Sequence, residues 1–389
     1  MEQTVSRRFP IDGGTASRPI LRFAARHAER PTTSSAATSL RRNGTGLSDA
    51  YVTRVEVRIA DLLSAERDRW CSRYPALEAG FDSLTAFVLG GGKRLRPRFA
   101  FWGFAGAGGS PDDDRLVDLG AAIEMLHAFA LIHDDVMDGS DSRRHQPTVH
   151  RRFAGLHAGR GWRGEERRVA EGFAILLGDL AFVYSTQLLH AAPARVRSLF
   201  DEMRIELHVG QYLDLVCAAS GSVDDPMIAD IARFKTAKYS VERPLHLGAA
   251  LAGIDALDDA FSRFGLAVGE AFQHRDDLLG VFGDPEETGK PCGDDIRTGK
   301  MTLLLQRALT SPDAGDVPAL VRMGTALLSE RDVSDIGAFL VESGAVGAVE
   351  ARIAALVDEA LRALRGAGLS DGASEGLERL ACSSAWRIE

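Results

Sequence analysis

Apolar residues recur every three or four positions along most of this chain, and that spacing is typical of helices with one buried face. The pattern starts near residue 47, where Val52, Val55 and Ile59 share a face and Ser48 stands where a helix cap is expected. No segment shows the alternation that is typical of a strand. The pattern therefore predicts an all-α fold.

Further helices are predicted at residues 84–89, 113–137, 169–190, 193–219, 227–240, 243–252 and 256–283. Segment 141–168 is polar and rich in glycine, which predicts either a mobile flap over a site or a surface loop. Residues 301–386 show helical patterns without a readable motif and are interpreted as scaffold. Residues 49–389 are therefore expected to form one large helical bundle.

Residues 1–48 differ from the rest of the chain, because they are rich in Arg, Ser, Thr, Gly and Pro and contain few acids. This composition predicts a disordered arm. Arg7, Arg8, Arg41 and Arg42 make the arm basic. Three interpretations remain open: a segment that docks a partner protein or a protein shell, an organellar transit peptide, or a passive tail.

The chain has 389 residues, 45% of them hydrophobic, and a formal net charge of −9. This length allows a large core, and the negative charge argues against non-specific binding of nucleic acid. The cysteines (Cys71, Cys217, Cys292 and Cys382) lack metal-site spacing, so reduced thiols in a cytoplasmic protein are expected. No apolar run approaches the ~20 residues that span a bilayer, so no transmembrane segment or signal peptide is predicted.

Three carboxylates, Asp134, Asp135 and Asp138, crowd the end of the predicted apolar helix 113–137. Asp134 and Asp138 share a helix face with His127. The acids repel one another at a helix C-terminus, which is an unfavourable position for negative charge, so a bound cation is expected. Oxygen ligands without a nearby cysteine favour magnesium, which usually bridges carboxylates to a phosphate. The alternative, a solvated acidic helix end, is weakened by the apolar run before the acids.

A second acidic pair, Asp276 and Asp277, ends another apolar helix about 140 residues later. If the two helices face each other in a bundle, their carboxylates line two walls of one cavity, where magnesium would clamp a diphosphate. Basic residues elsewhere would neutralise one diphosphate (Lys235, Lys290 and Lys300) and a second one (Lys93, Arg96 and Arg144). Taken alone, the glycine-rich turn before Lys93, Arg94 and Arg96 is a modest phosphate signal. Taken alone, Lys235 and Lys238 favour a solvated pair.

Five motifs occur together in one order: GGKRLRP, LIHDDVMDGSDSRR, KTAKYS, FQHRDDLLGVFGD and TGKPCGDDIRTGK. In these motifs the chain resembles the trans-isoprenyl diphosphate synthases, or polyprenyl synthases, over roughly residues 50–386. The resemblance implies an isoprenoid-synthase helical fold around a central apolar cavity, and a homodimer. It also implies magnesium-dependent condensation of isopentenyl diphosphate with an allylic diphosphate, with three magnesium ions when diphosphate is bound.

Carried over position by position, the resemblance implies three groups of site residues. The magnesium ligands would be Asp134, Asp138 and Asp276, assisted by Asp135 and Asp277. Isopentenyl diphosphate would be bound by Lys93, Arg96, His127 and Arg144. The allylic diphosphate would be bound by Arg143, Lys235, Thr236, Gln273, Lys290 and Lys300. The five aspartates, Lys235 and Arg143 would form the catalytic set.

The chain departs from the family pattern at two positions. Gly280 stands where many members have the third aspartate of the second motif, which predicts a weaker metal site with Asp284 as a helper. His145 follows the arginine pair where glycine is frequent, and little effect is expected.

The physical chemistry agrees with this reaction. Magnesium and lysines would draw charge from the leaving diphosphate, so that the C–O bond ionises to an allylic cation. The double bond of isopentenyl diphosphate would then attack the cation, and apolar walls would exclude water. Family precedent makes the departing diphosphate the acceptor of the lost proton, which explains why no general base is evident.

Phe129 lies five residues, about 7.5 Å of helix, before Asp134. Its ring would close the cavity after a few isoprene units beside the small Ala130; alternatively, it only packs in the core. In the family this combination most resembles geranylgeranyl (C20) synthases, with farnesyl (C15) synthases next. The second Asp-Asp pair and GGKRLRP argue against a class I terpene cyclase. Retention of both acidic motifs argues against a non-catalytic subunit.

Overall fold

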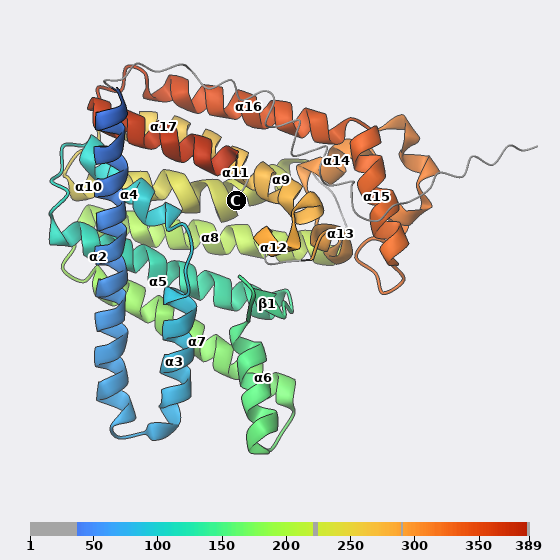
Figure 1. Ribbon diagram of the computed structural model, residues 1–389, viewed down its shortest axis with the longest axis horizontal. Helices are drawn as coiled ribbons and strands as arrows, with labels where there is room; N and C mark the ends of the chain where they lie inside the picture. The colour runs from blue at the N-terminus through green and yellow to red at the C-terminus, as the bar shows by residue number, and fades with distance from the viewer. Residues whose placement is uncertain (1–36, 221–224, 289–290, 387–389) are drawn as a thin grey trace, which may run out of the picture.

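The computed structural model describes residues 37–220, 225–288 and 291–386, and the described chain is almost entirely helical (Figure 1), which confirms the predicted all-α fold. The elements are α2 (Ala37–Cys71), η1 (Pro75–Leu77), α3 (Glu78–Leu89), α4 (Leu95–Gly106), α5 (Asp114–Met137), β1 (Ser142–Arg143), β2 (Gln146–Pro147), α6 (Val149–Arg160), α7 (Glu166–Leu188), α8 (Ala194–Ser220), α9 (Asp225–Ile231), the π-helix η2 (Ala232–Glu242), α10 (Arg243–Leu251), α11 (Asp258–Phe282), α12 (Pro285–Thr288), α13 (Asp294–Thr298), α14 (Leu303–Leu309), η3 (Pro312–Asp316), η4 (Pro318–Arg322), α15 (Glu330–Glu342), α16 (Ala345–Leu364) and α17 (Asp371–Ala385).

Helix α5 runs through the centre of the bundle and packs against α2, α4 and α7. Asp113 caps its start by accepting a hydrogen bond from the backbone N–H of Arg115 (2.9 Å). Leu119, Ile123 and Leu126 are fully buried, and burial of each such side chain contributes roughly 1.5–3 kcal/mol. The helix therefore presents its acidic end from a rigid, well-packed support.

The second acidic pair lies on α11, which packs against η2 and α16. Gly269 allows the close approach to η2, because a β-carbon there would lie 2.5 Å from the β-carbon of Ala237. Helices α4 and α10 cross in the same way: a β-carbon on Gly248 would lie 2.6 Å from the backbone nitrogen of Phe104. These close crossings fix the walls that carry the site.

Helix α2 begins at Ala37, before the predicted cap, so the prediction that a helix starts at Ser48 was wrong. Ser48 is buried within the helix and accepts a hydrogen bond from Arg98 (2.7 Å). Residues 1–36 of the predicted arm lie outside the described residues, and its disorder stays a prediction.

The prediction of a loop at 141–168 was also wrong. The segment forms a short antiparallel ribbon, β1 with β2, and then helix α6, which packs on α7. Phe153 of α6 stacks on Phe173 of α7 with ring centroids 4.5 Å apart. Helix α6 buries one face through only a few apolar residues. The polar composition of the segment therefore did not indicate a helix.

Two helices, α5 and α7, are long and apolar enough to cross a membrane by length and composition alone, contrary to the sequence expectation. The most apolar window of α5 is 72% buried inside the protein, as in a core helix, and that of α7 is 39% buried. The four cysteines are free thiols; Cys71 and Cys217 are buried and Cys292 is exposed.

Candidate active site

The first acidic cluster meets cations from two other parts of the chain. Asp134 accepts hydrogen bonds from Arg143 (3.3 Å) and from Lys235 (3.2 Å). Arg143 lies in the β1–β2 ribbon, and its Nε also donates to Asp135 (2.8 Å). Burial alone would lower the pKa of Arg143, but Asp135 and Asp134 outweigh it and hold the pKa above its ordinary value. The ribbon therefore folds back onto the end of α5.

The three carboxylates of this cluster have different surroundings. Asp134 is half-buried, Asp135 is 1% exposed, and Asp138 is exposed at the C-cap of α5. Burial raises the pKa of Asp135, although Arg143 opposes that effect. Asp135 therefore faces inward, toward Arg143.

Lys235 also binds Asp214 of α8, a residue that the sequence analysis missed (2.6 Å). Burial would lower the pKa of Lys235, but Asp134 and Asp214 hold it above its ordinary value. Asp214 lies in the apolar stretch Tyr-Leu-Asp-Leu-Val, where a lone acid inside an amphipathic helix was the only available signal. Lys235 thus joins α5, α8 and η2.

A second chain of contacts runs from η2 to the other acidic pair. Thr236 donates to the side-chain oxygen of Gln273, and the amide group of Gln273 donates to Asp277 (2.8 Å). Lys300 donates to the same oxygen of Asp277 (3.1 Å). Because Lys235 and Thr236 are neighbours, these contacts place the two acidic motifs around one region of η2. Asp276, beside Asp277, is half-buried.

The π-helical form of η2 directs its side chains to both acidic motifs. Its residues follow the wider π-helical pattern, which is rare and often found at functional sites. Lys235 reaches α5, Thr236 reaches α11 and Tyr239 reaches His127. The sequence predicted a helix here, but apolar periodicity did not reveal the π form.

A basic group lies beside the buried part of α5. Arg96 of α4 donates to Nε2 of His127 (3.1 Å), and Nδ1 of His127 lies 3.3 Å from the hydroxyl of Tyr239. Burial lowers the pKa of His127 well below its ordinary value, and the charges of Arg96, Arg144 and Arg143 add to that effect. His127 is therefore neutral; since Nε2 accepts from Arg96, Nδ1 carries the proton.

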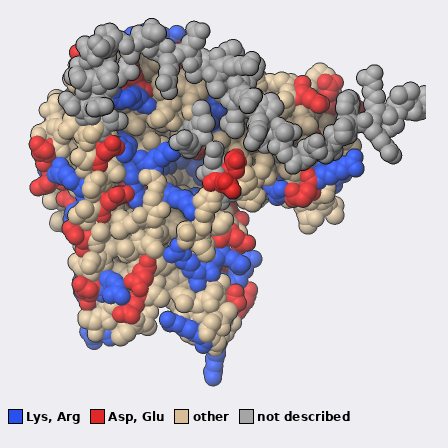
Figure 2. All heavy atoms as spheres, in the orientation of Figure 1, with Lys and Arg blue, Asp and Glu red and all other residues tan. Residues whose placement is uncertain are grey.

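The turn after α3 contacts the arginine pair. Arg144 donates to the carbonyl of Gly91, and a β-carbon on Gly92 would lie 2.9 Å from the guanidinium of Arg144. Gly92 has φ +123°, a backbone conformation that favours glycine. Figure 2 shows Lys and Arg side chains gathered over the part of this face where Figure 1 places the ribbon.

Arg94 has a structural role. It is buried and binds Glu124 (2.6 Å) and Glu56 (3.0 Å), which agrees with its absence from the predicted phosphate ligands of this turn, Lys93 and Arg96. Lys93 is exposed, and Arg96 is half-buried beside His127. Lys290 lies outside the described residues.

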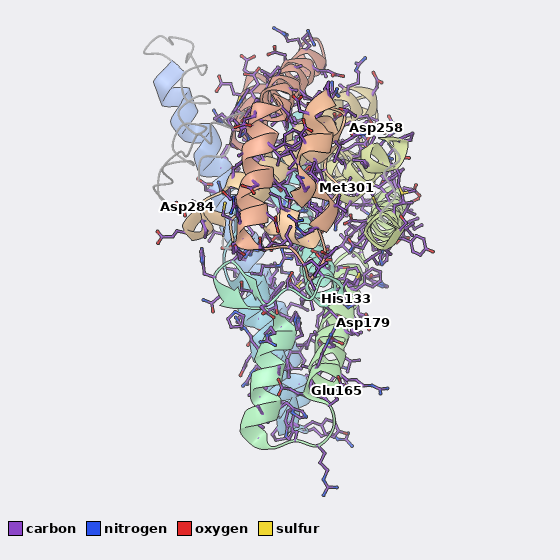
Figure 3. The ribbon with its side chains drawn as sticks, turned by 90° about the vertical axis from the view of Figure 1, so that its right-hand side faces the viewer. His133, Glu165, Asp179, Asp258, Asp284 and Met301 are labelled. Atoms are coloured by element: carbon purple, nitrogen blue, oxygen red, sulfur yellow. The ribbon has the colours of Figure 1, made fainter. Side chains whose placement is uncertain are left out.

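Phe129 lies deeper along α5, as predicted, and is 9% exposed. Its ring contacts three other rings, with centroid distances of 4.6 Å to His133, 4.9 Å to Phe182 and 5.5 Å to His208. Figure 3 shows His133 beside Asp179, and the ring of His133 lies 3.1 Å from the carbonyl oxygen of Ile175, so it points toward α7. Ala130 is half-buried.

The donor set fits magnesium, although the side chains are not arranged around an ion. Among the described residues, no three His, Cys, Asp or Glu side chains are grouped as a metal site. Arg143 and Lys235 neutralise Asp134, and one buried oxygen of Asp135 lacks a hydrogen-bond partner in the described part of the chain. The acids offer only carboxylate oxygens, which are the ligands that magnesium prefers. Asp134, Asp138 and Asp276 are the more accessible ones.

Comparison with known proteins shows the family to which the chain belongs. A sequence model of the polyprenyl synthetase family matches residues 81–325. The chain is 31% identical over 283 residues to the geranylfarnesyl diphosphate synthase of Aeropyrum pernix, covering 70% of this chain and 83% of that protein. It is 32% identical over 282 residues to the geranylgeranyl diphosphate synthase of Mycobacterium tuberculosis, covering 69% of this chain and 75% of that protein.

A solved structure shares the fold. The geranylgeranyl pyrophosphate synthase of Corynebacterium glutamicum, complexed with isoprenyl diphosphate and magnesium, is 36% identical, with a TM-score of 0.82 and coverage of 87% of this chain and 99% of that one. The chain therefore belongs to the polyprenyl synthetase family and is a prenyltransferase that makes isoprenyl diphosphates.

Proposed function

We propose that the protein condenses isopentenyl diphosphate with an allylic diphosphate to make geranylgeranyl diphosphate, with farnesyl diphosphate as the alternative product. The observation that carries this proposal is the set of contacts through η2, where Lys235 binds Asp134 while the adjacent Thr236 connects through Gln273 to Asp277. Two remote acidic motifs and several cations thus surround one place, which is what a metal-bound diphosphate requires.

The basic residues divide between two substrates. Arg143, Lys235 and Lys300 lie against the acidic motifs and would hold the allylic diphosphate. Arg96, His127 and Arg144, together with Lys93, would hold isopentenyl diphosphate beside the earlier part of α5, where His127 shares a helix face with Asp134. Neutral His127 accepts from Arg96 and turns its one N–H toward Tyr239, so it would position Arg96, whereas the arginines carry the positive charge. The two substrates would then meet along α5, with the reacting carbons between the two diphosphates.

Magnesium is the proposed metal, with Asp134, Asp138 and Asp276 as ligands and Asp135 and Asp277 in support. When bound, it would withdraw charge from the allylic diphosphate and so assist cleavage of the C–O bond. The number of ions, three in the family, is part of the proposal. Arg143 and Lys235 keep the carboxylates paired until the ions and the diphosphate arrive.

Phe129 is proposed to set the product length. Its ring closes the apolar side of α5 about 7.5 Å below Asp134, and the rings of Phe182 and His208 support it from behind. The proteins compared above include a synthase named for geranylfarnesyl diphosphate and others named for geranylgeranyl diphosphate, so their names do not agree on one chain length. The proposal of a C20 product therefore depends on the position of the Phe129 ring.

A homodimer is proposed from an exposed apolar face on α7 and α8. Leu176 and Val183 of α7 are 62% and 56% exposed, and Ile205 and Tyr212 of α8 are 59% and 70% exposed. Arg204 joins the two helices, because its guanidinium lies over Phe182 and donates to Thr186 (2.7 Å). Exposed apolar patches of this kind mark association surfaces, and a second copy is the commonest partner. A cytoplasmic location and a docking role for the N-terminal arm, residues 1–48, are kept as proposals.

The direct test incubates pure protein with isopentenyl diphosphate, magnesium and each allylic starter (dimethylallyl, geranyl or farnesyl diphosphate), followed by chromatography of the products. A C20 product is expected from all three starters. A cyclic hydrocarbon would instead favour a terpene cyclase. No turnover by a folded protein would favour a non-catalytic subunit.

A further inference from the structure

Gly280 lies against the carboxylate of Asp295. A β-carbon at Gly280 would lie 2.8 Å from one carboxylate oxygen of Asp295 and even closer to the other oxygen and to Cγ. Non-bonded atoms do not approach this closely, so any larger residue at 280 must displace Asp295. The space beside α11 at this position is therefore filled by an acid from another helix, α13.

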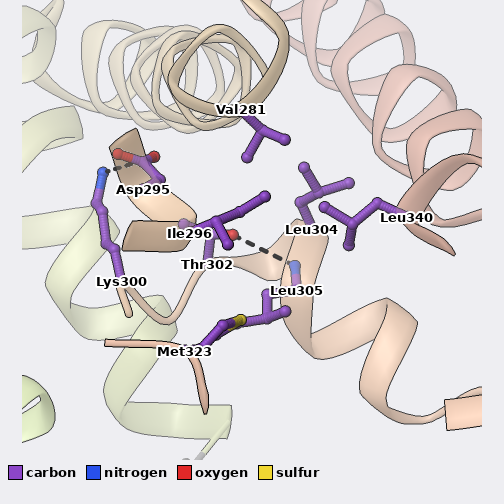
Figure 4. A pocket seen from close by; sticks show the side chains of 9 residues that line it. All are labelled: Val281, Asp295, Ile296, Lys300, Thr302, Leu304, Leu305, Met323 and Leu340. Carbon is purple, nitrogen blue, oxygen red and sulfur yellow. Dashed lines mark hydrogen bonds and ion pairs between the residues drawn. The ribbon is translucent and has the colours of Figure 1, made fainter. Parts of the chain in front are cut away.

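Asp295 faces the same lysine as Asp277. The ammonium group of Lys300 lies 3.1 Å from Asp277 and 3.6 Å from Asp295. Figure 4 shows Asp295 and Lys300 facing each other at the edge of a small pocket lined by apolar side chains such as Val281 and Leu304. The two carboxylates thus hold the cation from two sides.

The chain between Asp295 and Lys300 fixes their separation. The backbone N–H of Lys300 donates to the carbonyl of Asp295 (2.9 Å), and Gly299 has φ +69°, which ends the short helix α13. Ile296, next to Asp295, is 3% exposed and anchors the helix in the core. These features therefore fix the spacing between Asp295 and Lys300.

Asp284 takes a different position. It is exposed, and its carboxylate accepts a hydrogen bond from the backbone N–H of Glu286 (2.9 Å) at the start of α12. Figure 3 places it at the side of the molecule, apart from His133 at the first acidic motif. The structure gives Asp284 a local role at a helix start and gives the space beside Gly280 to Asp295.

We propose that Asp295 is a positioning residue that supplies, from α13, the carboxylate that Gly280 omits from the second acidic motif, and that it holds Lys300 in place for the allylic diphosphate. The inference rests on the proposed function, because it needs Lys300 to contact that diphosphate. Gly280 then leaves the space that the Asp295 carboxylate occupies, and its presence does not weaken the second acidic motif.

Burial would lower the pKa of Lys300, but Asp277 and Asp295 outweigh it and raise the pKa above its ordinary value. The lysine is consequently charged at every pH at which the protein would work. Without Asp295, Lys300 would stay charged, but its ammonium group would no longer be held in one position. The effect should therefore fall on binding of the diphosphate and not on the protonation of Lys300.

The experiment uses a set of four variants: Asp295→Asn, Gly280→Asp, the exchange Gly280→Asp with Asp295→Ala, and Asp294→Asn as the control. Asp294 is the preceding acid on the same helix and makes no contact used in this proposal. Calorimetry measures the binding of inorganic pyrophosphate in the presence of magnesium, and steady-state kinetics measure KM for each substrate. Circular dichroism checks that each variant is folded.

We expect Asp295→Asn and Gly280→Asp to bind magnesium pyrophosphate about tenfold more weakly, since each disturbs a charge-assisted contact of Lys300. KM for the allylic substrate should rise by a similar factor, while KM for isopentenyl diphosphate stays within about twofold. The exchange should recover most of the affinity, and Asp294→Asn should match the unaltered protein.

Unchanged pyrophosphate binding by Asp295→Asn would overturn the inference, as would an exchange variant no better than Gly280→Asp alone. If Gly280→Asp does not fold, Asp295→Asn decides the question. The proposed function fails in a different way: the unaltered protein would then neither bind magnesium pyrophosphate nor form an isoprenyl product.

Discussion

The ammonium group of Lys235 lies 3.2 Å from a carboxylate oxygen of Asp134, although the two residues are 101 positions apart in the chain. Lys235 comes from a π-helix and Asp134 from the end of the central α-helix. The contact joins two motifs that the sequence could only set side by side as a hypothesis. It also places a cation where a diphosphate would leave the allylic substrate.

Replacement of Lys235 by alanine should lower kcat by about 10²–10³-fold, because an electrostatic contact to the leaving group is lost. The matched control is Arg233→Ala, which removes an exposed cation from the same helix. Product formation under saturating substrate measures the effect. An equal loss in both variants would show that general charge, not the Asp134 contact, is responsible.

Phe129→Ala should lengthen the product beyond that of the unaltered protein, and Phe129→Leu should lengthen it less. The reason is steric, since removal of the ring opens space between α5 and the rings of Phe182 and His208. Chromatography of the products, scored by chain length, is the measurement. The variants also lose stability, by about 3–5 kcal/mol for alanine, so assays should be run well below the melting temperature. Unchanged length with activity retained would remove Phe129 as the floor.

The sequence predicted most of the long helices, because these rest on local patterns, but it did not predict α4 (Leu95–Gly106). Asp134 and Asp276 end long apolar helices, and apolar periodicity finds such helices reliably. Segment 149–160 was missed because its polar surface outweighs a few buried residues such as Phe153. The start of α2 was missed because Ser48 looked like a cap, whereas tertiary packing buries it.

Contacts across the chain were harder to predict. Asp214 is a lone acid, and Asp295 belongs to the pair Asp294–Asp295, to which the sequence assigned no role; only the fold brings Asp214 to Lys235 and Asp295 to Lys300. Arg94 stands between two predicted phosphate ligands in the sequence, whereas its side chain is buried against Glu56 and Glu124 and its backbone is left-handed (φ +47°). Such assignments depend on backbone geometry that composition and spacing do not contain.

His127 should make the stability of the protein depend on pH in the acidic range. Burial and the nearby arginines hold the pKa of His127 below its unfolded value of about 6.5. As the pH falls below that value, the unfolded chain gains a proton that the folded chain does not accept. The free energy of unfolding should therefore decrease by up to roughly 1.4 kcal/mol per pH unit, and it should be fully retained above pH ~6.5.

The comparison is between the unaltered protein and His127→Gln, with denaturant unfolding measured from pH 7.5 to 5, in steps of about 0.5. The variant should show a shallower decrease, because glutamine does not titrate. Identical slopes would mean that other groups cause the pH dependence.

Leu176→Asp and Tyr212→Asp should each shift the protein from dimer to monomer, because a charge on an apolar interface cannot be desolvated cheaply. Sedimentation velocity at several protein concentrations measures the shift. Val321→Asp is the control: Val321 is 86% exposed on η4, away from this face. A dimer that survives both changes would place the interface elsewhere.

His145→Gly should stabilise the protein by about 1 kcal/mol, contrary to the small effect expected from the sequence. Arg144 and His145 join β1 to β2 and both have positive φ, +51° and +60°. Two consecutive residues in this region form the tight turn that suits the twist of an antiparallel ribbon, and glycine adopts it without strain. Arg144 is held by its contact with Gly91, so His145 is the position that can be changed.

The control is Gln146→Gly in β2, where the backbone is not in the positive-φ region and glycine should cost about 0.5–1 kcal/mol. Chemical denaturation of both variants gives the two changes, and a loss of stability in His145→Gly would show that the imidazole makes a contact worth more than the relief of strain.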